Sequence, residues 1–293
     1  MAPRAATLVA LVALTGCLEL QGSSPPEPPP EGDGGGPAAP LGPIEGGVRV
    51  MSWNVETFPL AADTPARVAA IVEEHAPDVV AIQEIAEASA FAELDALLPD
   101  YEGVIDDDFD NYLRLGVLYR ADRVEIGEAE TLFSDEGWAF PRAPLSVPIT
   151  AAGFDFVLVS VHLKAMVDEE SRDRRALAME RLHTWLDEQL AEGGEQDYVI
   201  VGDFNDQLTD PPEWNVFTPF LEDARFRFLT LEHEQAGAFT YIPFEVMLDH
   251  ALLSESAAAA YGAGQTQIFA LDEIIGGFRE ISDHRPVVVD FAL

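Results

Sequence analysis

Tyr198-Val199-Ile200-Val201-Gly202-Asp203-Phe204-Asn205 is the stretch of this 293-residue chain that decides the fold. Its aromatic and β-branched residues predict a buried strand, which ends at a glycine and is followed at once by polar side chains. Asp203 and Asn205 are two residues apart, so in an extended segment they point the same way. A turn after a buried strand would also account for them, because Asp and Asn favour turns.

The same arrangement, an apolar run that ends in an acid, an amide or an imidazole, recurs along the chain. The further polar positions are Asn54, Glu84, His162, Asp249 and the pair Asp283-His284. Oxygen ligands suit a hard divalent cation, and an imidazole suits proton transfer near neutral pH. We expect these strand ends to converge on one site that combines a cation with an acid/base pair.

Two of these positions are ambiguous when each is taken alone. Asp249 is expected in the middle of an apolar strand, Val246–Leu253, where an acid without a partner would be costly. A histidine is the obvious partner, because a carboxylate fixes its tautomer and raises its basicity. His162 alternates with Ser160 and Lys164 on a polar stripe, which is usually a solvent-exposed face, so this pattern alone favours a structural histidine.

Helices and strands mix throughout the chain after Val48, and strands are the more numerous. Helices are expected over Thr64–His75, with Thr64 as the cap, and over Ser89–Leu98 and Glu169–Leu190. The strands are expected near 48–52, 79–82, 113–119, 124–126, 146–150, 154–163, 198–201, 246–253 and 286–291. This order favours two sheets packed face to face with helices outside, in one domain of about 245 residues.

The charge balance is extreme, with 16 Lys and Arg against 53 Asp and Glu and a formal net charge of −37. Such a surface repels phosphate backbones and anionic lipid headgroups. It argues against tight, sequence-tolerant binding of nucleic acid through basic patches. It does not exclude a polyanionic substrate that reaches a local site loaded with a cation.

The first residues are typical of a secretory signal, since Arg4 precedes an apolar run, Thr7–Leu14, that is too short to span a bilayer. The only cysteine, Cys17, ends the segment Leu14-Thr15-Gly16-Cys17, which resembles the bacterial lipobox, where the cysteine is lipid-modified and becomes the new N-terminus. We expect residues 1–17 to be a lipoprotein signal segment. An ordinary secretory signal with an incidental cysteine is the alternative.

Residues 18–47 are rich in Pro and Gly and contain almost nothing to bury, so they are expected to be a linker to a folded domain over 48–293. The expected protein is therefore extracytoplasmic. It would be held on a bacterial membrane, at the outer membrane or the cell surface, through the lipid anchor only.

Taken together, the polar islands resemble the endonuclease/exonuclease/phosphatase superfamily, which includes DNase I-like nucleases, inositol-phosphate phosphatases and sphingomyelinases. The islands stand in the order of that family: Ser52-Trp53-Asn54, Ile82-Gln83-Glu84, Val161-His162-Leu163-Lys164, Gly202-Asp203-Phe204-Asn205, Leu248-Asp249-His250 and Ser282-Asp283-His284-Arg285-Pro286. The resemblance covers Val48 to Leu293. It implies an α+β fold, a four-layer αββα sandwich of two packed, mostly antiparallel sheets with the site at one end.

The resemblance also implies a metal centre. Glu84 would be the principal ligand of Mg²⁺, with Asn54 and Asp283 close to the metal, and Mn²⁺ or Ca²⁺ are alternatives. A metal that neutralises phosphoryl oxygens would explain how so acidic a protein binds a phosphate.

The catalytic roles are implied in the same way. Asp203 and Asn205 would orient the attacking water and the phosphate. Asp249 would pair with His284, which would activate water or stabilise the transition state. His162 would contact a phosphate oxygen or help the leaving group depart. Abasic-site nucleases usually have a tyrosine at this position, so the chain leans toward the DNase I, sphingomyelinase or phosphatase branches.

Basic residues and the remaining histidines are weaker candidates. Arg142 stands in an Arg-Ala-Pro-Leu segment that resembles an Arg-Pro-Pro-Leu element of bacterial members, where it would contact substrate phosphate or cap a loop. Arg114 is a substrate-binding candidate of the same kind. Salt bridges on a helix face are expected for Arg172, Arg174 and Arg175, which acids surround. His183 and His233 are expected to be structural, and His250 is not a candidate because it should face away from the side of the strand that carries Asp249.

The leading hypothesis is a metal-dependent phosphodiester hydrolase of nuclease-like type, with nucleic acid as the first candidate substrate. A phosphatase or sphingomyelinase-like hydrolase of small phosphoesters or lipid headgroups is the alternative. A catalytically silent surface protein is the rival of a different class. Loops over 206–223 and 225–242 are expected to set the substrate, and the protein is expected to be a monomer.

Overall fold

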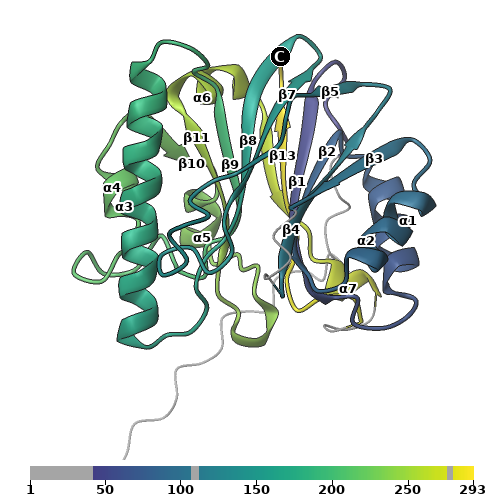
Figure 1. The fold of residues 1–293 in the computed structure, drawn as a ribbon, viewed down its shortest axis with the longest axis horizontal. Coiled ribbons are helices and arrows are strands. Elements are labelled where there is room, and N and C mark those ends of the chain that lie inside the picture. The colour runs from purple at the N-terminus through teal and green to yellow at the C-terminus, as the bar shows by residue number, and fades with distance from the viewer. Residues whose placement is uncertain (1–41, 107–111, 276–279) are drawn as a thin grey trace, which may run out of the picture. The chain divides into compact units, whose positions relative to one another are not determined.

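The computed structural model describes residues 42–106, 112–275 and 280–293. The expected signal segment, Cys17 and most of the expected linker lie outside these ranges. The described residues form two mixed β-sheets with helices on their outer faces (Figure 1), which confirms the expected four-layer sandwich of α+β class.

The first sheet has six strands in the order β12-β13-β1-β2-β4-β3. Its strands are β1 (Val48–Phe58), β2 (Val79–Ile85), β3 (Tyr101–Ile105), β4 (Arg114–Arg120), β12 (Gln265–Ile268) and β13 (Val287–Phe291). Among these strands β1 and β2 pair in parallel, and the other neighbours are antiparallel.

The second sheet has the order β10-β11-β9-β8-β7-β5, and β6 also pairs with β7. Its strands are β5 (Val124–Ile126), β6 (Glu130–Thr131), β7 (Leu145–Ala151), β8 (Phe154–His162), β9 (Tyr198–Asp203), β10 (Phe226–Phe228) and β11 (Asp249–Ser254). Here β8 and β9 form the parallel pair, so each sheet is mostly antiparallel around one parallel pair.

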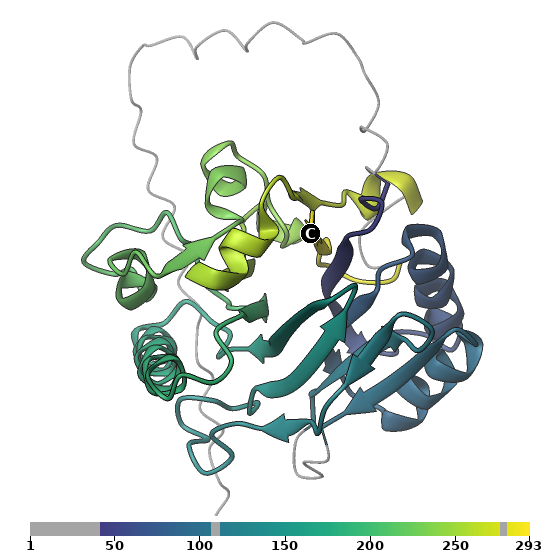
Figure 2. The same cartoon turned by 90° about the horizontal axis from the view of Figure 1, so that it is seen from above.

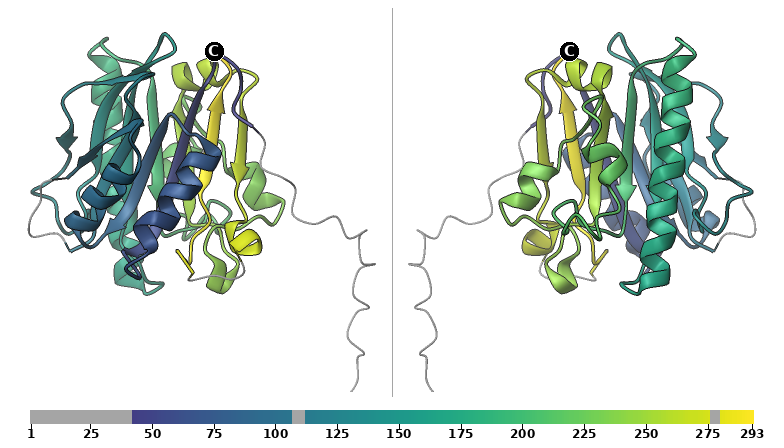
Figure 3. Two further views of the ribbon diagram at one scale, coloured as in Figure 1. Left: turned by 90° about the vertical axis from the view of Figure 1, so that its right-hand side faces the viewer. Right: turned by 90° about the vertical axis from the view of Figure 1, so that its left-hand side faces the viewer.

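Helices cover the outer faces of both sheets, as the side views show (Figure 3). The long helix α3 (Glu169–Ala191) packs on the second sheet, while α1 (Thr64–His75) and α2 (Ala88–Leu97) pack on the first. The shorter helices are α4 (Thr218–Leu221), α5 (Leu231–Gln235), α6 (Glu255–Tyr261), α7 (Leu271–Ile275) and the 3₁₀ turn η1 (Ile242–Phe244). No helix in the described ranges is both long and apolar enough to cross a membrane.

Alternation along each strand separates three apolar layers. In β8, Phe156 and Leu158 point between the sheets, whereas Val159 and Val161 point toward α3. The view from above shows the two sheets facing each other across the inner layer (Figure 2). The core therefore lies between the sheets, and the helices bury the two outer faces.

Three local expectations were wrong. Asp249 does not lie inside a strand but opens β11, with its backbone N–H bonded to Thr240 Oγ1. The Thr64 hydroxyl does not cap α1 but accepts from Ala61 N, one turn earlier, and Asp63 occupies the cap position without a side-chain hydrogen bond to the helix backbone. The polar stripe of β8 is not a solvent face, because the first sheet covers Ser160 and His162.

Candidate active site

The inner faces of several strands turn from apolar to polar at the same end of the sandwich. On β8 the sequence of inner positions is Phe156, Leu158, Ser160 and His162, and the first two belong to the inter-sheet core. The same change occurs on four other strands, at Ser52 and Asn54 of β1, Gln83 of β2, Asp203 of β9 and Asp249 of β11. All of these side chains are buried, so one end of the core is a polar pocket rather than a surface.

A polar layer lies beneath this pocket and ties the sheets together. The buried amide of Gln83 donates through Nε2 to Ser52 Oγ at 3.3 Å and to Ser160 Oγ at 3.1 Å. Ser52 and Gln83 belong to the first sheet and Ser160 to the second. Because buried polar groups need partners, this layer fixes the register between the sheets directly below the site.

Asn54 joins the carboxylates of the two sheets. Its Nδ2 donates to Glu84 Oε1 at 3.2 Å and to Asp203 Oδ2 at 3.0 Å. The other oxygen of Glu84 accepts from the Thr57 backbone N–H at 2.8 Å. His162 Nε2 lies 3.6 Å from Glu84 Oε1 and 3.5 Å from Asp203 Oδ2, so it faces both carboxylates.

His284 is held against Asp249 at the other side of the pocket. Its Nδ1 lies 2.7 Å from Asp249 Oδ2, while its Nε2 points toward Asp203 Oδ2 at 3.9 Å and Asp283 Oδ1 at 3.8 Å. The segment that carries it is fixed to β1, because Ser282 Oγ donates to the Asn54 carbonyl at 2.6 Å. The pairing expected between Asp249 and His284 is therefore present.

The electrostatics of this pair follow from burial and from three neighbouring acids. Burial, the largest effect, lowers the pKa of His284, but Asp249, Asp203 and Asp283 together raise it to about 10. Burial and the charge of Asp249 raise the pKa of Asp203 to about 7. The site thus favours an imidazolium beside a carboxyl group that exchanges its proton near neutral pH.

His162 is in the opposite state. Burial lowers its pKa well below the usual value, and the charges of Arg142 and His284 lower it further, so His162 is a neutral imidazole. Burial also lowers the pKa of Arg142, which donates through Nη2 to the Leu163 carbonyl. Arg142 therefore fixes the end of β8 and places a positive charge near Asp203 and Glu84.

Two site residues have left-handed backbone conformations. Glu84 has φ +65° although it lies within β2, and Asn205 has φ +55° just after β9. Of the two interpretations of this motif, the turn is the one present, because Asn205 does not continue an extended segment beside Asp203. Its N–H donates to Asp203 Oδ1 at 2.9 Å and its Nδ2 donates to the Leu163 carbonyl at 3.2 Å. Non-glycine residues in this region store strain, and they cluster at functional sites.

These residues open onto a cavity of about 860 Å³, which is within the range of small-ligand pockets. Its walls carry six acids, Glu56, Glu84, Asp203, Asp206, Asp210 and Asp283. Apolar side chains stand at the mouth, where Met166 is 67% exposed, Val167 96% and Phe244 75%. The carboxyl groups inside favour the binding of a cation and repel an anion that enters without one.

The donor set fits a hard divalent cation. Ligand atoms of Asp203, Asp249 and His284 lie within 4.8 Å of one another. Glu84 is near them, because both Glu84 Oε1 and Asp203 Oδ2 lie close to His162 Nε2, at 3.6 and 3.5 Å. Oδ1 of Asp249 is buried with no hydrogen-bond partner among the described residues. Carboxylate oxygens of this kind are the ligands that Mg²⁺, Mn²⁺ and Ca²⁺ prefer. Asn54 is not a ligand through its amide nitrogen, which donates to the carboxylates of Glu84 and Asp203, and its Oδ1 accepts from Glu56 N.

The basic residues differ from expectation. Arg114, at the start of β4, pairs through its backbone with Ile85 and is not among the residues that line the cavity. Arg175 makes no salt bridge on the face of α3 but is buried, bonded to Asp206 Oδ2 at 2.8 Å and to the carbonyls of Lys164 and Met166. These bonds hold the loop between β8 and α3, so a residue that sequence reasoning assigned to the surface shapes the cavity wall.

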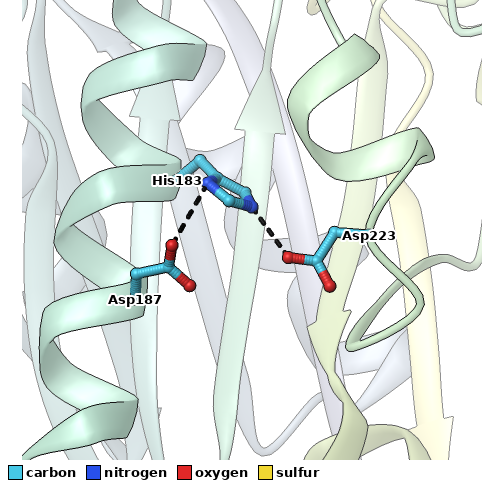
Figure 4. Close-up of side chains that lie close together, drawn as sticks. All are labelled: His183, Asp187 and Asp223. Atoms are coloured by element: carbon cyan, nitrogen blue, oxygen red, sulfur yellow. Dashed lines mark hydrogen bonds and ion pairs between the residues drawn. The ribbon is translucent and has the colours of Figure 1, made fainter.

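Outside the cavity, His183 is structural as expected, and His250 is structural as well. His183 of α3 lies 2.9 Å from Asp223 Oδ2 and 3.7 Å from Asp187 Oδ2 (Figure 4). Arg225 pairs with the carboxylates of both Asp187 and Asp223, so both acids already have a cationic partner from the protein. His250 is buried, and its ring nitrogens contact Thr230 Oγ1 and the Asp206 carbonyl.

Comparison with known proteins gives one family match and a set of similar structures. The model described as the Endonuclease/Exonuclease/phosphatase family matches residues 51–284. No curated protein matches the chain. The solved structure of truncated TDP2 from Caenorhabditis elegans superposes with a TM-score of 0.65 at 17% identity, over 84% of this chain and 97% of that one.

Two further structures are similar over comparable lengths. TDP2 from D. rerio, complexed with a single strand DNA product, has a TM-score of 0.65 at 19% identity, over 84% of this chain and 99% of that one. An endonuclease/exonuclease/phosphatase from Bacteroides vulgatus has a TM-score of 0.59 at 20% identity, over 84% and 99% of the two chains. At such identities the likeness establishes a common fold.

Proposed function

The chain belongs to the endonuclease/exonuclease/phosphatase family, and on that premise we propose that it is a metal-dependent hydrolase that cleaves phosphodiester bonds by activated water. One observation carries the proposal. His284, paired to Asp249 at 2.7 Å, points its free Nε2 at Asp203, across a cavity from the neutral His162. An imidazolium, a neutral imidazole and several carboxylates around one cavity are the groups that phosphoryl transfer to water requires.

The surroundings of each residue in the site support a specific role in this reaction. Glu84, Asp203 and Asp283 would hold the cation, which when bound neutralises the phosphoryl oxygens. Asp203, whose Oδ2 faces both His162 Nε2 and His284 Nε2, would orient the attacking water. The imidazolium of His284, kept in place by Asp249, stabilises negative charge on the phosphate or delivers a proton. The neutral His162 donates a hydrogen bond to a phosphate oxygen or assists the leaving group.

Hydrolysis of bis(p-nitrophenyl) phosphate tests the proposal. We expect release of p-nitrophenol with Mg²⁺, its loss in EDTA, and a decrease of at least about 10²-fold in Glu84→Ala and His284→Ala. Glu93→Ala on the exposed face of α2 and His233→Ala are the matched controls. Equal, slow release by the wild type and the variants, with and without chelator, would mean that the protein is a catalytically silent scaffold.

Nucleic acid or its fragments are the substrate class that we propose first. The D. rerio protein of similar fold is complexed with a DNA product, and phosphodiesters fit the acid-lined cavity once a cation is bound. The apolar mouth formed by Met166, Val167 and Phe244 favours a second candidate, a phosphoester that carries an apolar group, such as a phospholipid with its acyl chains. Activity on sphingomyelin but on no nucleotide or nucleic acid would select this second candidate.

We also propose that Cys17 is lipid-modified and anchors the domain outside the cytoplasm. The support is the apolar run that ends in Leu14-Thr15-Gly16-Cys17, followed by the Pro- and Gly-rich residues 18–47. Labelling with a radioactive fatty acid should mark the wild type and leave Cys17→Ser unlabelled. An unlabelled wild type would contradict the anchor without affecting the proposed reaction.

A further inference from the structure

We propose that Arg172, backed by the indole of Trp214, binds a second phosphate of the substrate, one nucleoside away from the phosphate that is cleaved. The proposal rests on the hydrolase function above and narrows its substrate to a phosphodiester that carries two phosphates. It gives a binding role to a residue that its charged neighbours in the sequence assign to the protein surface.

Arg172 lies in the first turn of α3 and lines the catalytic cavity. Its Cζ lies 5.5 Å from the centroid of the Trp214 ring, and the indole is itself 57% exposed. Among the residues that the structure describes, the Arg172 side chain has neither a hydrogen bond nor an ion pair. A cation–π contact holds a guanidinium in place but leaves its N–H donors unused.

The neighbouring arginines on α3 differ from Arg172, because their side chains use N–H donors in hydrogen bonds. Arg174 also lies over a tryptophan, with Cζ 4.7 Å from the Trp138 ring, but its Nε donates to the Trp138 carbonyl at 2.6 Å. Arg175 is buried and uses its donors on Asp206 and two carbonyls. Arg172 alone of the three combines a place in the cavity wall with unused donors.

The charge pattern of the cavity makes an anion the fitting partner. Of the two arginines that the described residues place in its wall, Arg175 is paired with Asp206, so Arg172 is the guanidinium that is left for an anion. A guanidinium binds phosphate through two parallel N–H···O bonds, a geometry that a lysine cannot reproduce. The cleaved phosphate belongs beside His162 and His284, so the anion at Arg172 is a different group of the same substrate.

A short substrate fits these charges better than a long one. The net charge of −37 repels an extended polyanion over most of the surface. A nucleotide ester with two phosphates meets only the cation-loaded centre and Arg172, and the cavity of about 860 Å³ accommodates it. Trp214 lies in the segment 206–223, one of the two loops expected from the sequence to set the substrate.

The test compares two esters that differ in one phosphate, thymidine 5′-(p-nitrophenyl phosphate) and the same ester with a 3′-phosphate, both with Mg²⁺. We expect the wild type to prefer the ester with the 3′-phosphate by about tenfold in kcat/KM, and Arg172→Gln to abolish this preference. Arg172→Lys should retain part of it. Because the preference is a ratio within one protein sample, partial misfolding of a variant cancels.

Arg174→Gln is the matched control, since it removes a guanidinium from the same helix and a similar cation–π contact outside the cavity. It should keep the full preference. The inference would be overturned if the wild type showed no preference for the ester with the 3′-phosphate. It would also be overturned if the wild type and Arg172→Gln showed the same preference. In that case continued cleavage of bis(p-nitrophenyl) phosphate would leave the proposed function standing.

Binding provides a readout that does not depend on turnover. Calorimetry should show that thymidine 3′,5′-bisphosphate binds the wild type about tenfold more tightly than thymidine 5′-monophosphate, and that Arg172→Gln binds both equally. The difference should shrink as the salt concentration rises, since the contact is partly exposed. Equal affinities of the wild type for the two nucleotides, or no binding of either, would refute the second phosphate site.

Discussion

Replacing Gly202 by alanine should separate the two strands that carry the catalytic side chains. A Cβ at this position would lie 2.0 Å from the carbonyl oxygen of Val161 and 2.9 Å from its carbonyl carbon. Gly202 has φ +141°, a conformation that L-residues rarely adopt. The obstacle is backbone of the parallel neighbour β8, which cannot rotate away as a side chain could. The strands must therefore move apart directly beside the paired residues His162 and Asp203.

The expected loss of stability in Gly202→Ala is the sum of two energetic costs. An unfavourable φ costs about 1 to 3 kcal/mol, and forcing an extra methyl into packed backbone costs about 1 to 3 kcal/mol more. We expect Gly202→Ala to lower the free energy of unfolding by about 4 kcal/mol. Gly193→Ala is the control, because Gly193 has φ +72° but nothing within 4 Å of the added Cβ. It should show only the conformational cost, about 1 kcal/mol.

Urea denaturation followed by circular dichroism measures both free energies, and hydrolysis of bis(p-nitrophenyl) phosphate reports the site. Gly202→Ala should lose activity even at temperatures where it remains folded, whereas Gly193→Ala should keep it. Equal destabilisation by the two substitutions would refute the argument from the Val161 carbonyl. Full activity in folded Gly202→Ala would show that the spacing of β8 and β9 does not position Asp203.

Three other perturbations have outcomes that the structure sets. Asp249→Asn removes the charge that holds His284, so kcat should fall by about 10² to 10⁴-fold; an unchanged kcat would contradict the pairing. Arg49→Ala leaves the buried carboxylate of Asp290, now bonded to Arg49 at 2.6 Å, without its ion-pair partner and with only the Gln265 amide, among the described side chains, donating to it, and should cost about 3 to 5 kcal/mol in urea unfolding. Arg67→Ala removes two exposed ion pairs, with Asp63 and Glu280, and should leave the unfolding curve nearly unchanged. Burial and a neighbouring carboxyl raise the pKa of Asp210 to about 6, so the stability that its protonated form contributes is present below about pH 4 and is lost as the pH rises through about 6. Asp210→Asn should therefore gain stability relative to the wild type between about pH 5 and pH 8, and parallel pH profiles would rule this out.

The fold could be predicted from the sequence where alternation and length are clear. The helix expected over Glu169–Leu190 differs from α3 by one residue, because its apolar face repeats over about six turns. The strand expected over 124–126 has the same bounds as β5. By contrast β3, β10 and β12 were not expected, since segments such as Tyr101–Ile105, with an exposed Glu and a Gly, are extended only because a neighbouring strand pairs with them.

Most residues of the site could be predicted from the sequence, but their arrangement in space could not. Polar residues at the ends of apolar runs identified Asn54, Glu84 and His284, and the family resemblance placed them in order. The residue pattern of a strand does not show what packs on each of its faces. Ser160 and His162, which lie on an inner face, therefore resembled a solvent-exposed stripe. Gln83, which joins the sheets, had no signal apart from its place before Glu84.

Arg172 illustrates a second reason why the arrangement of the site could not be predicted from the sequence. Local sequence sets which residues lie near each other on a helix, and the acids around Arg172 predict salt bridges. The direction that its side chain takes depends on Trp214, which is distant in the sequence, and on a cavity that exists only after the sheets have packed. Information of this kind is held in the tertiary structure and not in any window of the sequence.

The pairing of β1 with β13 sets the order in which this domain can assemble. Val48 lies opposite Phe291, so the first strand of the domain completes its hydrogen bonds only with the last one. Asp283 and His284 arrive on the same final segment. While the chain is still emerging it has neither a closed first sheet nor an imidazole at Asp249, so the site is complete only once this last strand has been synthesised. The adjacent ends also make the domain a good subject for circular permutation, with a new linker joining β13 to β1.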